Sequence, residues 1–353
     1  MGKKTVIALC AILFNVVTGG FIASATGLPA WSVIGGGTAL SAVMGGNQGS
    51  LNMAIQREIW MSTIVEGLFA DNSFLSKAVN ADAFVNQGRT VHVPNAGAPS
   101  GVKKNRTDLP AAVKVRTDKD LVFNLDEFTT DPIRIPHADT VELSYSKRES
   151  VIRGDRSTLI EKVSEAILFS WAPEAANTIK TTGAAVDAHT VAATGKRKAF
   201  TKHDVNAVML KFNRQNIPQS GRYLLIDADM HAQLLESLTE NEANAFHALA
   251  DVKNGTIGKL YSFNIMMRSS ALRYTSAGKA KESTTAGAAA DNAAALAWHE
   301  DSVCRALGEV VVFDNPGDAT YYSDILSFLL RCGGRPMRDD VAGLCAIVQD
   351  AAA

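Results

Sequence analysis

The chain has 353 residues, of which 46% are hydrophobic and 20% are charged, and its formal net charge at pH 7 is −1. This length allows two domains, or one elaborated α/β domain with a sizeable core. The near-neutral charge provides no global basic field, which argues against tight, sequence-independent wrapping of nucleic acid and leaves only local charge to line DNA.

The first 46 residues combine a basic start with two apolar runs. The run Thr5–Val17 is followed by the A-x-A triplet Ala23–Ala25, a pattern that matches a secretory signal peptide. A second, glycine-rich run, Leu28–Gly46, also allows a membrane hairpin or anchor, although both runs are near the lower length limit of a spanning helix. Two further interpretations stay open: an apolar arm buried in an assembly, and a translation start upstream of the true one, which would be Met44.

Residues Met53–Val79 are amphipathic and predict a helix that ends near Asp71 and Asn72. The apolar stripe consists of Ile55, Ile59, Trp60, Ile64, Leu68 and Phe69. Periodicity alone fits an ordinary core helix equally well.

A polar segment between two strands comes next. Arg89–Pro94 and Leu121–Leu125 predict the strands. The residues between them, Asn95–Asp120, are rich in Gly, Pro, Lys, Arg and Asp and contain few large apolar side chains. Such a segment is either disordered or held by a partner. Because a two-stranded ribbon is only marginally stable alone, we expect its order to depend on neighbouring molecules.

Phe128–Pro136 predicts a further strand, whose prolines suit an edge or a bend. A longer helical region is expected from Asp139, with Asp155 or Ser157 as the cap of a clear helix that ends before Pro173. Its predicted buried face consists of Leu159, Ile160, Val163, Ala166, Ile167 and Ser170.

The stretch from Phe200 to Leu238 contains the sharpest local pattern. Thr201 is a predicted N-cap, with a carboxylate three residues later, and Pro218 should end this helix near Gln215 or Asn216. Its apolar stripe is Val205, Val208, Met209 and Phe212. Tyr223–Ile226 then predicts a buried strand that runs into a second N-cap, Asp227, and a second helix.

The surrounding segments are less regular. Ala184–Lys198 is small and polar and predicts a connector, Glu240–Val252 a loop or helix, and Thr275–Asn292 a flexible segment of low complexity. Further predicted strands are Leu296–His299, Glu309–Phe313, Ser323–Arg331 (ending at Gly333 and Gly334) and Ala342–Val348. We expect these strands to form one sheet against the helix that precedes Pro173.

Three of these stretches together resemble the major capsid proteins of tailed bacteriophages. NIPQSGRYLLIDADMHAQLLES (residues 216–237) is similar to the family's helix, "n-[VI]-P-x-x-G-R" turn, strand and "x-x-L-L" helix. Asn254–Leu272 resembles the "G-x-I-G-x-[IL]-x-x-F-x-[VI]" strand-turn-strand, and Ala294–Leu307 resembles a later strand with its His. The succession, which spans roughly Met53 to Val348, is typical of the Hong Kong 97-type capsid fold.

This resemblance implies an α+β chain with an N-terminal arm, an extension loop built as a β-hairpin, a peripheral domain made of a long spine helix and a sheet, and an axial domain. The implied boundaries are an apolar N-terminal segment (1–52), the arm (53–87), the extension loop (88–130), the peripheral domain with its spine helix (131–183), the axial domain (184–305), and the return strands of the peripheral domain with the C-terminus (306–353).

The resemblance also implies contacts between subunits. The candidate contact residues are Trp60, Lys103, Lys104, Arg106, Arg148, Arg153, Asp155 and Arg156. A solvated charged face remains the alternative for the charged ones. Some family members form a covalent cross-link from a loop lysine; here Lys103 and Lys104 are candidates by position only.

Motifs for catalysis or metal binding are missing from the sequence. The seven histidines are scattered singly, without H-E-x-x-H or ligand spacing, and there is no G-x-S-x-G, P-loop or kinase signature. Cys10, Cys304, Cys332 and Cys345 form no C-x-x-C and indicate small buried residues, which favours a reducing cytoplasm. We therefore predict no catalytic, cofactor-binding or metal-binding residue and a protein that is not an enzyme.

The expected function is that of a major capsid protein, a subunit that assembles as pentamers and hexamers into an icosahedral phage head around double-stranded DNA. The implied partners are further copies, packaged DNA bound non-specifically on the inner face, and scaffold, portal and decoration proteins, with assembly in the host cytoplasm and no membrane. Two alternatives stay open: an encapsulin-like compartment shell, and an exported or membrane-tethered α/β binding protein.

Overall fold

The computed structural model describes Ile64, Leu68 and residues 72–86, 89–95, 102, 104–107, 113, 119–136, 147–251, 255–318 and 320–352. The chain divides into Met1–Thr63 and Ile64–Ala353, and every described residue lies in the second unit. The predictions for residues 1–52 lie outside the described residues, as does most of the helix expected in Met53–Val79, of which Ile64 and Leu68 are helical and buried. Among the described helices, none is both long and apolar enough to cross a membrane.

The core of the second unit is an eight-stranded sheet. Its main path is β11-β12-β10-β15-β13-β14, and β18 pairs with both β15 and β7. The strands are β7 (Thr178–Lys180), β10 (Arg222–Asp227), β11 (Thr256–Leu260), β12 (Phe263–Arg268), β13 (Leu272–Tyr274), β14 (Ala280–Lys281), β15 (Asn292–His299) and β18 (Leu344–Val348). Strand β10 runs parallel to β12 and antiparallel to β15, so the buried apolar run of β10 lies in the middle of the sheet.

Three helices cover one face of this sheet: α6 (Lys202–Arg214), α7 (Ala228–Ser237) and α8 (Glu240–Ala248). The predicted start of α6 is confirmed, because the backbone N–H of Thr201 donates to Asp204 Oδ2 over 2.8 Å. The predicted end is confirmed as well, with Gln215 as the C-cap. Asp227 caps α7 as predicted, accepting from the N–H of Met230 at 2.7 Å. Phe212 packs into the shared core.

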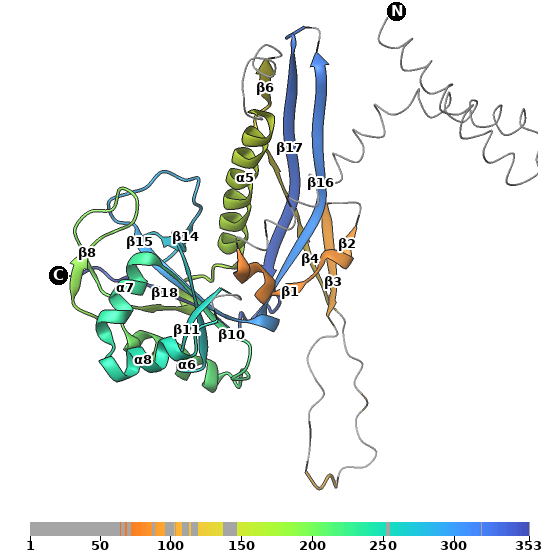
Figure 1. Ribbon diagram of the computed structural model, residues 1–353. Coiled ribbons are helices and arrows are strands. Elements are labelled where there is room, and N and C mark those ends of the chain that lie inside the picture. The colour runs from red at the N-terminus through yellow and green to blue at the C-terminus, as the bar shows by residue number, and fades with distance from the viewer. Residues whose placement is uncertain are drawn as a thin grey trace, which may run out of the picture. The chain divides into compact units, whose positions relative to one another are not determined.

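The second sheet has five strands: β1 (Val79–Asn80), β5 (Asp126–Thr129), β6 (Ile133–Pro136), β16 (Val303–Asp318) and β17 (Ser323–Pro336). Strands β16 and β17 form one long antiparallel hairpin, and the helix α5 (Lys147–Trp171) lies along β17 (Figure 1). At the end of α5, Trp171 Nε1 donates to the carbonyl of Cys304 at 2.9 Å. Trp171 also contacts Trp298 on the other face of the eight-stranded sheet, at 5.9 Å between ring centroids, and so connects the two sheets.

The remaining strands form two smaller sheets. One is the predicted extension hairpin, with β2 (Val85–Asn86), β3 (Thr90–Asn95) and β4 (Lys119–Asn124) paired from Thr90↔Asn124 to Asn95↔Lys119. The other joins β8 (Ala185–Asp187) to β9 (Lys196–Lys198). Short 3₁₀ turns are η1 (Ser73–Lys77), η2 (Asp82–Phe84), η3 (Ala175–Asn177) and η5 (Glu300–Ser302).

Two predictions about the sheets are wrong. The strands in Leu296–His299 and Ala342–Val348 do not join the sheet along α5; as β15 and β18 they pair with each other in the eight-stranded sheet. A short apolar run indicates that a strand is buried, but it carries no information on which neighbour it pairs with. The connector predicted at Ala184–Lys198 is instead the β8–β9 hairpin.

Three predicted boundaries also differ from the structure. Helix α5 runs through Asp155 and Ser157, neither of which caps it; inside the helix, Thr158 Oγ1 donates to the carbonyl of Gly154. The strand predicted at Phe128–Pro136 divides into β5 and β6, which both pair with β17 along its edge. Strand β17 continues through its two glycines to Pro336.

Candidate interaction surface

The turn between α6 and β10 is organised by one buried arginine. Arg222 is fully buried and donates to the carbonyls of Ile217 (2.6 Å) and Pro218 (2.7 Å) and to Asn213 Oδ1 (2.9 Å). Its guanidinium also lies over Phe212, 5.6 Å from the ring centroid. In the sequence, Arg222 stands out only as the final residue of the Pro-containing turn motif, and its burial was not predicted. Its contacts are internal, and they fix the turn rather than present a reactive group.

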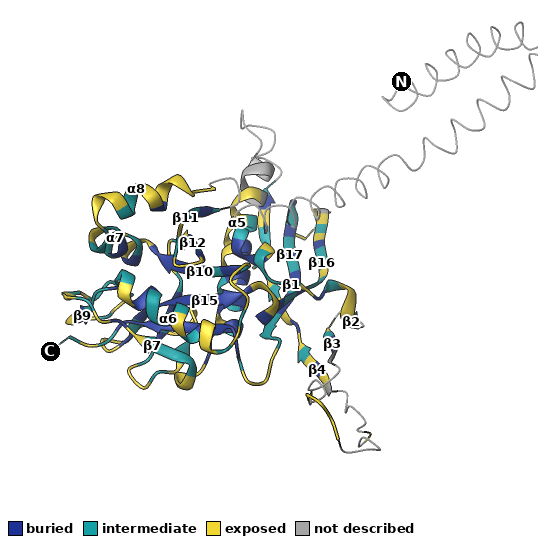
Figure 2. Ribbon diagram, turned by 90° about the horizontal axis from the view of Figure 1, so that it is seen from below, coloured by how far each residue is buried: buried dark blue, intermediate teal, exposed yellow. Residues whose placement is uncertain are grey.

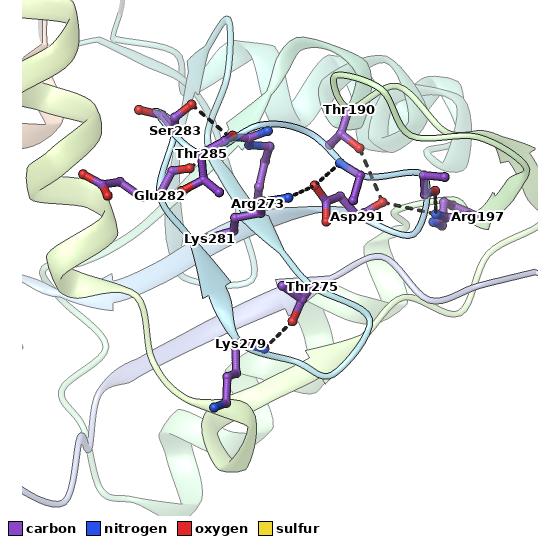
Figure 3. Close-up of polar contacts among 12 residues, drawn as sticks. Thr190, Arg197, Arg273, Thr275, Lys279, Lys281, Glu282, Ser283, Thr285 and Asp291 are labelled. Carbon is purple, nitrogen blue, oxygen red and sulfur yellow. Dashed lines mark hydrogen bonds and ion pairs between the residues drawn. The ribbon is translucent and has the colours of Figure 1, made fainter.

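A second polar network holds the loop that follows β13 (Figure 3). Arg273 Nη2 donates to the carbonyls of Glu282, Ser283 and Thr285 at 2.8–2.9 Å. Lys281 Nζ lies 2.7 Å from Asp291 Oδ2. Burial alone would raise the pKa of Asp291, but the hydrogen bonds from Lys281 and from the backbone N–H of Ala288, with the charges of Lys281 and Arg273, lower it. The low complexity of Thr275–Asn292 predicted a flexible segment and did not predict these hydrogen bonds.

Arg197 contributes to the same network from β9 and is buried. Its guanidinium donates to Asn292 Oδ1 at 2.6 Å and to the carbonyls of Thr194, Ala289 and Asp291 (Figure 3). The flanking lysines are paired as well, Lys196 with Asp187 and Lys198 with Asp350. The three consecutive basic residues therefore do not form a common charged patch.

A His and two Asp side chains meet at the start of α7. His189 Nε2 lies 2.9 Å from Asp227 Oδ2, and His189, Asp227 and Asp229 offer ligand atoms within 4.8 Å of one another. Burial would lower the pKa of His189, but the hydrogen bond to Asp227 and the charges of both carboxylates raise it above its usual value. Because Asp227 already caps α7 and the helix N-terminus opposes a cation, this group is better suited to anchor the β8–β9 loop than to bind a metal.

The predicted contact residues occupy two separate places. Lys104 and Arg106 are exposed on the extension loop, where Asn105 turns with φ of 50°. Arg153 is exposed on α5, Asp155 and Arg156 are half-buried there, and Arg148 lies in the same helix. Trp60 and Lys103 lie outside the described residues. The structure shows no hydrogen bond or ion pair between any two of Lys104, Arg106, Arg153, Asp155 and Arg156, so the role of the candidates between subunits stays a prediction.

A groove beside α5 was not predicted from the sequence. It has a volume of about 510 Å³ and lies between α5, the β5–β6 connection and residues 282–284 of the loop after β14. Phe128, Ile133 and Leu159 supply its apolar lining. Asp155 also lines it, and Asp155 Oδ2 is buried without a hydrogen-bond partner among the described residues. Burial raises the pKa of this carboxyl.

Large apolar side chains are exposed on the two projecting ribbons. Val102 and Val113 on the extension loop are 97% and 94% exposed, and Tyr322 at the turn of the β16–β17 hairpin is 81% exposed. Figure 2 shows the contrast with the eight-stranded sheet, where β10 and β15 are almost wholly buried. Among the described residues, the three most exposed large apolar side chains therefore lie on elements that extend from the cores.

Comparison with known proteins identifies the fold. No protein-family model matches the sequence, and no characterised protein sequence matches it either. Among solved structures, the capsid of Ralstonia phage GP4 is similar over 78% of this chain and 88% of its own, with 11% identity and a TM-score of 0.52. The capsid of the cyanophage P-SCSP1u is similar over 78% and 86%, with 15% identity and a TM-score of 0.51. A virus-like particle from Pyrococcus furiosus is similar over 83% and 99%, with 10% identity and a TM-score of 0.50. The fold is therefore the α+β Hong Kong 97-type capsid fold, as predicted.

Proposed function

We propose that the chain is a self-assembling shell subunit, the major capsid protein of a tailed phage. The observation that carries this proposal is the capsid fold combined with two ribbons that expose large apolar side chains at the loop or turn that joins their strands. A two-stranded ribbon that exposes valines and tyrosines is stabilised when another surface covers it. Copies of the same chain are the partner that every subunit of a shell encounters.

The proposed mechanism is geometric. The region around the eight-stranded sheet acts as the axial domain; it takes most of residues 184–305 and also β18 from the C-terminal part. Helix α5 and the five-stranded sheet act as the peripheral domain, and the hairpin within residues 88–130 acts as the extension loop. Heterologous contacts that close into rings of five and six build a shell, and many modest contacts on one subunit reinforce one another.

The proposed partners follow from this role. The shell encloses double-stranded DNA held non-specifically, and scaffold, portal and decoration proteins complete the head in the host cytoplasm. The subunit has no enzymatic activity and needs no cofactor.

Expression of the whole chain alone, followed by sucrose-gradient sedimentation and negative-stain electron microscopy, tests the proposal. We expect closed particles of uniform size. A well-ordered monomer at high concentration would contradict a shell subunit.

Native particles test the enclosed cargo and the rival functions. We expect nuclease-protected DNA inside them; an enclosed enzyme without DNA would instead identify an encapsulin-like compartment. N-terminal sequencing of the natural protein addresses export, because a mature end at Thr26 would contradict assembly in the cytoplasm.

A further inference from the structure

The lining of the groove beside α5 carries more negative than positive charge. It includes three carboxylates, from Asp131, Asp155 and Glu282, and one ammonium group, from Lys162, which leaves a net charge of −2. Lys162 Nζ is bonded to Glu165 at 3.1 Å, and Glu165 lies outside the lining. The groove therefore attracts cations.

One oxygen in this lining has a specific need. Asp155 Oδ2 is buried and has no hydrogen-bond partner among the described residues. The hydroxyl of Thr158, which also lines the groove, donates to the Gly154 carbonyl at 3.2 Å instead. A buried carboxylate oxygen that loses water without gaining a donor is costly. A charged N–H donor that enters the groove would supply the missing bond.

Apolar side chains lie between these charges. Phe128 from β5, Ile133 from β6 and Leu159 from α5 line the same groove, and the first two are partly exposed. A small, purely charged ligand would leave this surface in contact with water, whereas methylene groups would cover it. The lining therefore matches a ligand that joins positive charge to an aliphatic chain.

The spacing of the carboxylates argues against a single metal ion. Across the described ranges, the one group of three possible ligand side chains within 4.8 Å of one another is His189, Asp227 and Asp229, away from the groove. The three carboxylates of the groove are therefore too widely spaced to coordinate one ion together. A volume of about 510 Å³ also suits a small molecule better than an ion.

The wall formed by residues 282–284 is held in place by the chain itself. Arg273 Nη2 donates to the carbonyls of Glu282, Ser283 and Thr285 at 2.8–2.9 Å (Figure 3). These bonds leave the carboxylate of Glu282 available at the groove, because they involve its backbone. A wall that is already ordered lowers the entropic cost of binding.

We propose that this groove binds a linear aliphatic diamine or polyamine. One ammonium group donates to Asp155, a second lies toward Asp131 or Glu282, and the methylene chain packs against Phe128 and Leu159. An alkylammonium carries three N–H donors, so it can give Oδ2 the bond that it lacks and still reach water or a second acceptor. The site does not depend on the proposed shell function, and either can fail without the other.

Equilibrium dialysis of the whole chain against radiolabelled putrescine, a four-carbon diamine, tests the site. We expect binding that saturates at about one diamine per chain. Asp155→Asn keeps the shape of the side chain and removes its charge, so it should weaken binding at least about tenfold. Glu282 is exposed, and Glu282→Gln should weaken binding about two- to fivefold.

Two controls separate this site from general attraction to an acidic surface. Glu161→Gln removes the same charge from an exposed acid of α5 outside the lining, and it should bind putrescine within about twofold of the wild type. Butylamine has the same carbon chain with one ammonium group and should bind at least about tenfold more weakly.

Three outcomes of the dialysis would overturn the proposal. They are the absence of saturable putrescine binding, equal affinities of Asp155→Asn and Glu161→Gln, and butylamine binding as tightly as putrescine. Displacement of putrescine by an equal concentration of Mg²⁺ would identify a metal site and would also overturn it.

Thermal unfolding gives an independent readout. Putrescine should raise the melting temperature of the wild type, because a ligand that binds only the folded chain stabilises it. Asp155→Asn should melt at the wild-type temperature without putrescine and show little of this shift. A shift as large as that of the wild type would contradict the role of Asp155. If the variant melts lower on its own, Glu282→Gln, on the exposed wall, takes its place in the comparison, and an undiminished shift there would count equally against the site.

Discussion

The region around the eight-stranded sheet and the extension hairpin obtain their order in different ways. In the first, two arginines are satisfied internally: Arg222 and Arg197 are buried and bonded to carbonyls of neighbouring turns. In the second, a small cluster that includes Val91 and Leu121 supports the base of the ribbon, and the loop beyond it exposes Val102 and other side chains to solvent.

This difference shows where the free energy of folding and that of assembly reside. The sheet region buries its apolar surface against its own helices, which suffices for a stable fold. The described residues of the hairpin loop (102, 104–107 and 113) are all exposed. Under the proposed function, this loop depends on surface that another molecule provides. Changes in the first region should alter the stability of the subunit, and changes in the second should alter the shell.

The largest expected effect comes from removing the loop. Replacing residues 96–118 with a short Gly/Ser turn leaves the Asn95↔Lys119 pair at the end of the ribbon in place. We expect a soluble subunit with an unchanged melting temperature and no closed shells, as judged by sedimentation and electron microscopy. Normal particles from this variant would show that assembly does not depend on the loop.

The next largest effect is expected inside the sheet region, at Arg222. Arg222→Ala removes the donor from the part-buried carbonyls of Ile217 and Pro218. An unsatisfied group costs about 1–3 kcal/mol when it is fully buried, so for these two part-buried groups together we expect a loss of about 3 kcal/mol. Urea unfolding of the loop-replaced subunit measures it. The exposed Arg214, at the end of the same α6 helix, is the control, and its alanine variant should lie within about 0.5 kcal/mol of the parent.

The sequence predicted the features whose partners are close along the chain, and it missed those whose partners are distant. The cap at Thr201, the end of α6 before Pro218 and the cap at Asp227 are all confirmed. Each of these depends on residues within about four positions, so a local pattern is sufficient to identify it.

The features that escaped prediction depend on distant residues. The burial of Arg197 is set by Asn292 and Ala289, more than ninety positions away, and the partner of β18 is β15. The unpartnered oxygen of Asp155 becomes visible only once β5, β6 and the loop after β14 are placed around α5. The pattern of charge and hydropathy along the chain does not predict which residues from distant segments will be in contact.

Gly334 and Gly154 differ in how much space surrounds them, and substitution by alanine should therefore have opposite effects on stability. A Cβ at Gly334 would lie 2.6 Å from Trp171 Nε1 and 2.9 Å from the Cys304 carbonyl, which are themselves hydrogen-bonded. We expect Gly334→Ala to destabilise the subunit by about 1–3 kcal/mol, as overpacking does. A Cβ at Gly154, inside α5, would meet nothing within 4 Å, so Gly154→Ala should stabilise it by about 0.5–1 kcal/mol. Equal melting temperatures for the two variants would contradict the tight packing at Trp171.

The smallest expected effect is a pH dependence at His189. The pKa of His189 in the folded chain is raised above the usual 6.5, because Asp227 and Asp229 outweigh burial. The pair therefore contributes its full stability below pH 6.5, and this contribution is lost as the pH rises through the folded-state pKa. In urea unfolding of the loop-replaced subunit, His189→Gln should cost more at pH 5.5 than at pH 8.5. A larger cost of His189→Gln at the higher pH would contradict the direction of the shift and, with it, the ion pair that holds the β8–β9 loop on α7.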